Sequence, residues 1–357
     1  MKVLIVSSSL QMGGIERSST NLANTFVKKG VTTHFLCIFN HNNFFKLDPK
    51  ITVHLPKNKK NQRINLIKSF FRIRIIANQI KPDSILVFNK FNGAITLFSL
   101  MGLKYPVYIS ERASPLYKFP LHISVFNSIS YFLFKPAGVI AQTEYAAAAQ
   151  RLYYKKQTKI KVINNPIISS TDYVIPKKKQ ILAVGRLNDK MKGFDLLIES
   201  FAILDIPEWK IAFAGGDIHT DKNLCDRIKE LGITDKVRFL GKIKDLGPVY
   251  AESSIFILPS RSEGFPNALV EAMANGLPCI SFNIPAVKEI IVNNINGITT
   301  KCFDIQEMAT NMIELIQNND KRYKLGEEAK KIKMKLDIDI ISKEFLDFIL
   351  VKKNSDV

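Results

Sequence analysis

The sequence lacks the features that mark a disulfide-linked, zinc-binding or membrane-spanning protein. Its 357 residues hold four cysteines, far apart and without a CxxC pair, and five histidines without ligand spacing. Neither a disulfide framework nor a metal site is therefore indicated. No apolar run reaches the ~20 residues that a membrane-spanning helix needs. The first residues lack a signal-peptide core, so we expect a protein of the reducing cytoplasm.

Acidic residues are scarce in the first half of the chain. Residues 1–170 contain 24 lysines and arginines against 5 aspartates and glutamates, whereas residues 171–357 contain 27 of each kind. This asymmetry predicts a polyanionic partner for the first half, either nucleic acid or an anionic membrane. Segment 57–81 is basic, has no acidic residue and spaces its apolar residues as a helix does. It is the candidate lipid-binding segment, and a core-packed helix with a solvated basic face is the alternative.

Short apolar strands alternate with helical stretches through both halves of the chain. Apolar strands separated by helices are typical of a parallel sheet covered on both faces. The stretch 164–179, with two prolines and a lysine run, is predicted to be a linker. We therefore expect an α/β protein of two doubly wound, Rossmann-like domains, 1–168 and 169–336, facing a cleft.

One helix is expected at a strand end of the second domain. Pro266 suits a first helical turn and Asn275-Gly276 a helix end, which predicts a helix over 266–275. Its N-terminal amides, after Gly264, form an anion site where open α/β sheets bind ligands. A diphosphate fits this site.

Two glutamates and two cations belong to the same region. Glu263 lies in the loop before the helix, and Glu271 points from the helix body, where an unpaired carboxylate is costly to bury. A buried glutamate satisfied by protein groups is the alternative. Arg186 ends a strand and Lys192 precedes a helix, so both can reach the same sheet edge. Singly each is more simply a solvated loop charge, but together they could neutralise a leaving diphosphate without metal.

The stretches "GRLNDKMKGFDLLIESF" and "PSRSEGFPNALVEAMANGLPCI" resemble the retaining family 4 glycosyltransferases of the GT-B fold, and the likeness extends over the whole chain. The resemblance implies that Glu271 binds the ribose hydroxyls and that Glu263 contacts the donor sugar. It implies that Arg186 and Lys192 hold the diphosphate, that neither metal nor other cofactor is needed, and that a last helix (337–353) packs back on the first domain.

Further site residues follow from the same resemblance. The catalytic set is Arg186, Lys192 and Glu263. The nucleotide-sugar site is completed by Gly14, Gly241, Gly264, Phe265, Pro266, Asn267 and Glu271. The acceptor side holds Gly13, Glu111 and Arg112, although similar enzymes often carry a histidine near the position of Arg112.

We expect a hexosyltransferase that moves a hexose or N-acetylhexosamine from a UDP-sugar to a lipid-linked saccharide. It would lie peripherally on the inner face of the cell membrane and serve surface glycan assembly, such as capsule or lipopolysaccharide O-antigen. A nucleotide-sugar epimerase of the same fold is one alternative. A basic nucleic-acid-binding protein is another, but it leaves the glutamates and cations unexplained and shows no recognised motif, so no nucleic-acid partner is expected.

Overall fold

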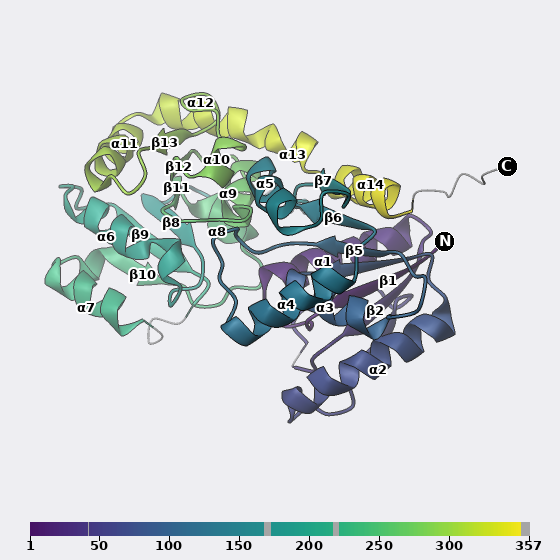
Figure 1. The fold of residues 1–357 in the computed structure, drawn as a ribbon. Helices are drawn as coiled ribbons and strands as arrows, with labels where there is room; N and C mark the ends of the chain where they lie inside the picture. The colour runs from purple at the N-terminus through teal and green to yellow at the C-terminus, as the bar shows by residue number, and fades with distance from the viewer. Residues whose placement is uncertain (42, 168–172, 217–220, 351–357) are drawn as a thin grey trace. The chain divides into compact units, whose positions relative to one another are not determined.

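The structure, a computed structural model, describes residues 1–41, 43–167, 173–216 and 221–350 (Figure 1). It divides into two compact units, one formed by Met1–Ile168 with Leu336–Val357 and the other by Ser169–Lys335. Each unit contains one parallel sheet with helices, of seven and six strands respectively. This confirms the predicted α/β fold class. None of the described helices is long and apolar enough to cross a membrane.

The sheet of the first unit has the strand order β3-β2-β1-β4-β5-β6-β7. Its strands are β1 (Lys2–Ser7), β2 (Thr32–Cys37), β3 (Thr52–His54), β4 (Ser84–Phe88), β5 (Val107–Ser110), β6 (Gly138–Ala141) and β7 (Ile160–Val162). The helices described in this unit are α1 (Gly14–Lys28), α2 (Gln62–Ile80), α3 (Lys90–Ser99), α4 (Leu121–Leu133), α5 (Glu144–Tyr153) and α14 (Ile338–Ile349). The central strands are apolar on both faces because helices cover both sides of a parallel sheet.

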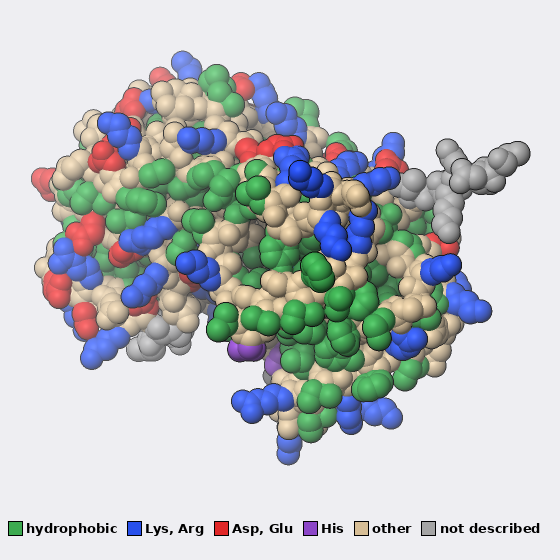
Figure 2. Space-filling view, viewed as in Figure 1, with side chains coloured by type: hydrophobic (Ala, Val, Ile, Leu, Met, Phe, Trp, Pro, Cys, Tyr) green, Lys and Arg blue, Asp and Glu red, His purple; other side chains and the backbone are tan. Residues whose placement is uncertain are grey.

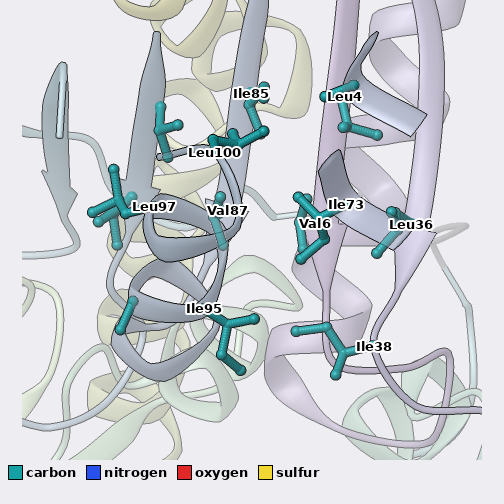
Figure 3. Close-up of a cluster of buried hydrophobic side chains, with 14 of the residues drawn as sticks. Leu4, Val6, Leu36, Ile38, Ile73, Ile85, Val87, Ile95, Leu97 and Leu100 are labelled. Carbon is teal, nitrogen blue, oxygen red and sulfur yellow. The ribbon is translucent and has the colours of Figure 1, made fainter. Parts of the chain in front are cut away.

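Helices α2 and α3 cover one face of this sheet. Leu4 of β1 and Val87 of β4 point into the same apolar layer as Ile73 of α2 and Ile95 of α3 (Figure 3). All four side chains are fully buried. Burial of each contributes roughly 1.5–3 kcal/mol, so this layer fixes where α2 and α3 lie on the sheet.

The last helix, α14, packs on the first unit. It lies within the predicted range 337–353, whose final three residues fall outside the described part. Asp339 of α14 pairs with Lys29, the residue after α1, with Oδ1 and Nζ 3.0 Å apart. The rings of Phe348 and Tyr108 of β5 lie 5.4 Å apart in an edge-to-face contact. Helix α14 is thus part of the same unit as residues 1–168.

The sheet of the second unit has the order β10-β9-β8-β11-β12-β13. Its strands are β8 (Gln180–Val184), β9 (Lys210–Ala214), β10 (Val237–Phe239), β11 (Ile255–Leu258), β12 (Cys279–Phe282) and β13 (Ile298–Thr300). The α-helices described are α6 (Phe194–Ala202), α7 (Lys222–Glu230), α8 (Gly247–Glu252), α9 (Asn267–Ala274), α10 (Pro285–Lys288), α11 (Ile305–Gln317), α12 (Asn319–Lys330) and α13 (Ile332–Lys335). Within the predicted linker, residues 168–172 lie outside the described part, and 173–179 form no regular element.

Candidate functional site

The candidate site of the second unit lies where β8 and β11 run side by side. The two strands pair in parallel, with Ile255 opposite Ile181. From β8 the chain builds β9 and β10 on one side of the sheet, and from β11 it builds β12 and β13 on the other. Loops that leave such neighbouring strands in opposite directions open a crevice at their carboxyl ends, the usual ligand site of doubly wound sheets.

Lys192 and Glu263 meet at this switch point. The Lys192 Nζ lies 2.8 Å from Glu263 Oε1, and only 23% and 11% of their side chains are exposed. The Ser260 hydroxyl donates to the same oxygen at 2.7 Å. The structure thus brings two predicted site residues together and adds Ser260, which the sequence reasoning missed although it lies only two residues after β11. Two donors on one oxygen orient the carboxylate of Glu263.

A second set of contacts holds the two loops together. The Arg261 guanidinium donates to both carboxylate oxygens of Asp195, at 2.8 and 2.6 Å. Burial opposes ionisation of Asp195, but the hydrogen bonds and charge of Arg261 hold its pKa below the usual value. Gly193 has φ of +66°, and a Cβ there would lie 2.0 Å from the carbonyl oxygen of Pro259. Only glycine allows this approach of the loop after β8 to the loop after β11.

Arg186 takes a different partner. It follows β8, as predicted, but its guanidinium pairs with Asp189 of its own loop at 2.7 Å. The Arg186 side chain is largely exposed. An exposed pair of this kind contributes little to stability, so Arg186 can exchange Asp189 for another anion at small cost.

Helix α9 begins and ends one residue inside the predicted range 266–275. Pro266 is the residue before the helix, with φ −82° and ψ 69°, and is not in its first turn. A proline needs no amide partner at either position, so the predicted start of the helix is wrong by one residue only. Past the other end, Gly276 has φ of +73°, as the predicted stop requires.

Glu271 of α9 contacts a residue that sequence reasoning did not select. The buried Tyr250 of α8 donates its hydroxyl to Glu271 Oε2 at 3.3 Å. A tyrosine among apolar residues gives no sequence signal of this contact, because its ring alone suits a core position. Part of the polar environment of Glu271 is therefore supplied by the protein.

The remaining predicted residues of this unit surround the same sheet edge. Phe265 is buried and accepts a hydrogen bond from the amide of Asn267 at 2.9 Å, and Gly264 precedes it in the loop before α9. Gly241 follows β10 with φ of +69°, and its carbonyl accepts from the Gly215 amide at 2.8 Å.

In the first unit, Gly13 and Gly14 form the start of α1. Gly13 is the residue before the helix, and a Cβ there would lie 2.3 Å from the Glu16 Oε2. The chain's own carboxylate thus lies against this glycine, and burial raises the pKa of Glu16. A pocket of about 360 Å³ is lined by Gln11 of the same loop with Asn40, His41, Asn43, Leu55 and Lys59.

Glu111 and Arg112 follow β5, as predicted, but face different surroundings. The buried Glu111 accepts hydrogen bonds at Oε1 from the amides of Arg112 and Ala113, at 3.1 and 3.2 Å. Burial raises the pKa of Glu111, and the charge of Lys90 opposes this.

The Arg112 guanidinium lies between two aromatic rings. Its central carbon is 5.4 Å from the ring of Phe88 and 5.5 Å from that of Phe345 on α14. Its three nitrogens are buried and find no hydrogen-bond partner in the described part of the chain. Burial lowers the pKa of Arg112 to about 9, against the effect of Glu111. The last helix was expected to pack on this unit, but no sequence pattern predicted that its Phe345 would lie against Arg112.

Among the described residues, no group of three or more His, Cys, Asp or Glu side chains is placed to hold a metal ion. Two closely spaced aspartates, Asp337 and Asp339, lie at the start of α14. Asp337 caps α14 by accepting a hydrogen bond from the Asp339 amide at 2.7 Å.

Two parallel-sheet units, with charged loops at a switch point, are the architecture of the GT-B glycosyltransferases. The model of the family described as Glycosyltransferase Family 4 matches residues 12–170, and that described as Glycosyl transferases group 1 matches residues 169–332. The chain is a glycosyltransferase, and the two matches support its assignment to family 4.

Individual relatives are also named as glycosyltransferases. An uncharacterized glycosyltransferase of Haemophilus influenzae is 29% identical over 93% of this chain and 95% of its own length. A Campylobacter jejuni enzyme, named as a GalNAc-alpha-(1->4)-GalNAc-alpha-(1->3)-diNAcBac-PP-undecaprenol alpha-1,4-N-acetyl-D-galactosaminyltransferase, is 26% identical over 99% of this chain and 100% of its own. The Anabaena protein HepE, solved in complex with UDP, has a TM-score of 0.78 at 19% identity, with 97% and 99% of the chains covered, and shows the shared fold.

Proposed function

We propose that this glycosyltransferase moves a hexose or N-acetylhexosamine from a UDP-sugar to a lipid-linked saccharide, with retention of configuration and without metal. The observation that carries the proposal is the Lys192–Glu263 pair at the β8/β11 switch point, beside the start of α9. A UDP complex of HepE and the lipid-linked acceptor named for the Campylobacter enzyme support the two substrates.

The charged site residues of the second unit have distinct roles in this reaction. The bond from the anomeric carbon to the diphosphate breaks, a bond to the acceptor hydroxyl oxygen forms on the same face, and UDP leaves with the hydroxyl proton. Lys192, Arg186 and the first amides of α9 stabilise the charge that develops on the diphosphate. Glu263 orients the donor sugar, and Glu271 accepts hydrogen bonds from the ribose hydroxyls.

Gly13, Glu111 and Arg112 form the acceptor side in this proposal. A lipid-linked acceptor brings the enzyme to the inner face of the cell membrane, where surface glycans such as capsule or O-antigen are assembled. In segment 57–81 most exposed cations gather before and within the first turns of α2, at Lys57, Lys59, Lys60, Arg63 and Lys68, and one more, Lys81, follows its last turn. Anionic lipid attracts such a cluster by roughly 1 kcal/mol for each basic residue near the surface.

Arg72 and Arg74 of α2 are engaged within the protein. Arg72 donates to the carbonyl oxygen of His54 at 3.1 Å, and Arg74 donates to that of Met101 at 2.7 Å. The charge that α2 offers to a membrane therefore comes mainly from its N-terminal end.

A thermal-shift panel of nucleoside diphosphates and nucleotide sugars tests the donor. A ligand that binds only the folded protein raises the melting temperature, so UDP and one UDP-sugar should stand out from GDP and dTDP compounds. Incubation of the stabilising UDP-sugar without acceptor, followed by proton NMR, distinguishes a glycosyltransferase from an epimerase. Appearance of an isomeric nucleotide sugar would contradict the proposal, as would the absence of any stabilising nucleotide.

A further inference from the structure

Helix α4 exposes apolar residues and buries polar ones. Leu121, Val125, Ile129 and Phe132 follow at spacings of four, four and three, and thus form one stripe along the helix. All four are exposed, Leu121 by 81% and Phe132 by 72%. The buried side carries Asn127, Ser130 and Tyr131, and neither Asn127 side-chain atom has a hydrogen-bond partner among the described residues. The helix is amphipathic with its apolar stripe turned outward.

Helix α2 also carries an outward apolar stripe, in addition to the apolar residues that pack on the sheet. Ile64, Ile67, Phe71 and Ile75 form its exposed stripe, with Phe71 exposed by 69% and Ile67 by 65%. Asn65 and Ser69 lie on its buried side together with two apolar residues. Helix α2 is therefore packed on the core through Ile73 and Ala77, as the alternative for segment 57–81 expected, and it carries a second set of apolar residues on its outer side.

A cluster of aromatic rings joins α2, α3 and α4. The ring of Phe70 on α2 lies 5.9 Å from Phe98 on α3 and 6.1 Å from Phe126 on α4, and Phe98 and Phe126 are 6.2 Å apart. Phe98 is itself partly exposed between the helices. Figure 2 shows hydrophobic side chains gathered over α4 and on toward α2. We call this surface the apolar face, and it includes Ile67, Phe71, Phe98, Leu121, Ile129 and Phe132. Contiguous apolar surfaces of this kind mark interaction sites.

The charge around the apolar face indicates its partner. Residues 49–82 and 112–143, which contain α2 and α4, have no acidic residue. The exposed Lys118 and Lys135 flank α4, and the cations at the start of α2 flank the other stripe. A second copy of the chain docked through this surface would place cations opposite cations. An anionic bilayer offers negative head groups and an apolar interior together.

We propose that the first unit inserts the apolar face into an anionic bilayer, with the stripes of α4 and α2 among the upper acyl chains and the flanking lysines at the head groups. This deepens the proposed function and rests on its lipid-linked acceptor. Arg112 on the acceptor side is joined to α4 by residues 113–120, in which Leu116 and Tyr117 are also exposed. Insertion of α4 therefore keeps the acceptor side close to the lipid that carries the acceptor.

A tryptophan probe tests insertion directly. The variant Ile129→Trp places the probe on the apolar face, and Tyr323→Trp places a control at an exposed position of the second unit. The native Trp209 is buried in the second unit and supplies a constant background. With vesicles of phosphatidylglycerol and phosphatidylcholine, the first variant should show a blue shift and lose emission when the acyl chains are brominated. Quenching of neither variant, or of both equally, would overturn the proposal.

Sedimentation with the same vesicles separates insertion from charge attraction. The triple variant Leu121→Ser/Ile129→Ser/Phe132→Ser should bind about 100-fold or more weakly, since each exposed side chain contributes roughly tenfold when buried in lipid. This loss should persist at high salt, where charge attraction is screened. All three positions are exposed, so the fold should survive.

A matched triple in the second unit, Val292→Ser/Ile295→Ser/Tyr323→Ser, removes comparably exposed apolar residues and should bind like the unaltered protein. Unchanged binding of the α4 triple would overturn the proposal. So would a dimer of the unaltered protein that the α4 triple dissociates without effect on vesicle binding, because the face would then join two copies. The vesicle assays contain neither donor nor acceptor, so insertion can be observed even if sugar transfer is not, and transfer to a water-soluble acceptor can be observed even if insertion fails.

Discussion

Lys192 and Glu263 stand 71 positions apart in the chain, yet their side chains meet at 2.8 Å. The contact forms because β8 and β11 are neighbours and their loops leave the same sheet edge. When an anionic ligand binds, Lys192 must share its charge between Glu263 and the ligand, or exchange one for the other. Substitution of either residue should therefore affect the site.

Removal of the Lys192 charge should slow transfer without unfolding the protein. We expect Lys192→Ala to lower kcat by roughly 10² to 10³, the scale for one preorganised donor at a developing charge. Arg227→Ala is the control, because Arg227 also pairs with a glutamate, Glu199, in the same unit but far more exposed. Equal turnover of Lys192→Ala and the unaltered enzyme would exclude this role.

Turnover should survive treatment with EDTA. Lys192, Arg186 and the amides of α9 supply the positive charge that a divalent ion would otherwise bring to the diphosphate. Initial rates of the EDTA-treated enzyme should equal those measured after magnesium or manganese is added back. A strict dependence on either ion would contradict the metal-free proposal.

The two glutamates should differ in what they affect. Glu271→Ala should weaken UDP binding by ~1.5–3 kcal/mol, because a ribose contact is the same in ground and transition states. Glu263→Ala should lower turnover and leave UDP affinity nearly intact, because the ligand contact proposed for Glu263 is to the donor sugar, which UDP lacks. Calorimetry with UDP, together with turnover, measures both. Equal loss of UDP affinity in the two variants would show that their roles are wrongly divided.

Tyr250→Phe gives a finer test of the same site. It removes the hydroxyl that donates to Glu271 and keeps the buried ring. We expect UDP affinity to fall by ~0.5–1.5 kcal/mol with kcat little changed, since the hydroxyl positions Glu271 and does not touch the sugar. A loss of stability with unaltered UDP affinity would make this contact purely structural.

Two glycines with the same backbone angle should respond differently to alanine. Gly193 and Gly232 both have φ of +66°, but a Cβ meets the Pro259 carbonyl at 2.0 Å only at Gly193, and meets nothing within 4 Å at Gly232. Gly232→Ala should cost about 1 kcal/mol for the left-handed conformation alone. Gly193→Ala should lower the free energy of unfolding by more than this. It should also impair sugar transfer, because the loops that hold Lys192 and Glu263 must move apart. Thermal denaturation of the two variants measures the difference, and equal melting temperatures would refute it.

The histidine pair at the β2/β3 edge should make the first unit sensitive to acid. Burial lowers the pKa of His34 and of His54, whose ring nitrogens lie 3.3 Å apart. In the unfolded chain these two histidines bind protons near pH 6.5, whereas in the folded chain they do so only at lower pH. Stability is therefore fully present above this pH and falls as the pH drops toward the lowered folded values. The melting temperature of His54→Gln should decline less between pH 7.5 and 5.5 than that of the unaltered protein, whereas the exposed His122→Gln should follow the unaltered protein.

Local patterns in the sequence were enough to predict the α/β class and the charged loops. Strands buried on both faces appear as continuous apolar runs, and Pro266 and Gly276 mark the ends of α9 within one residue. These signals are short in range, because each depends on a strand, a turn or one helical period. The likeness of the loop segments to known enzymes then supplied the roles expected of Arg186 and the two glutamates.

Only the tertiary structure decided which distant side chains meet and which way a helix faces. Tyr250 reaches Glu271, and Phe345 of the last helix covers Arg112, through contacts that no local pattern contains. The apolar spacing of α2 and α4 was legible in the sequence, but a periodic stripe carries no information on whether it points inward or outward. The packing of Ile73 against the sheet turned Phe71 to the surface, because residues two positions apart lie on opposite sides of a helix.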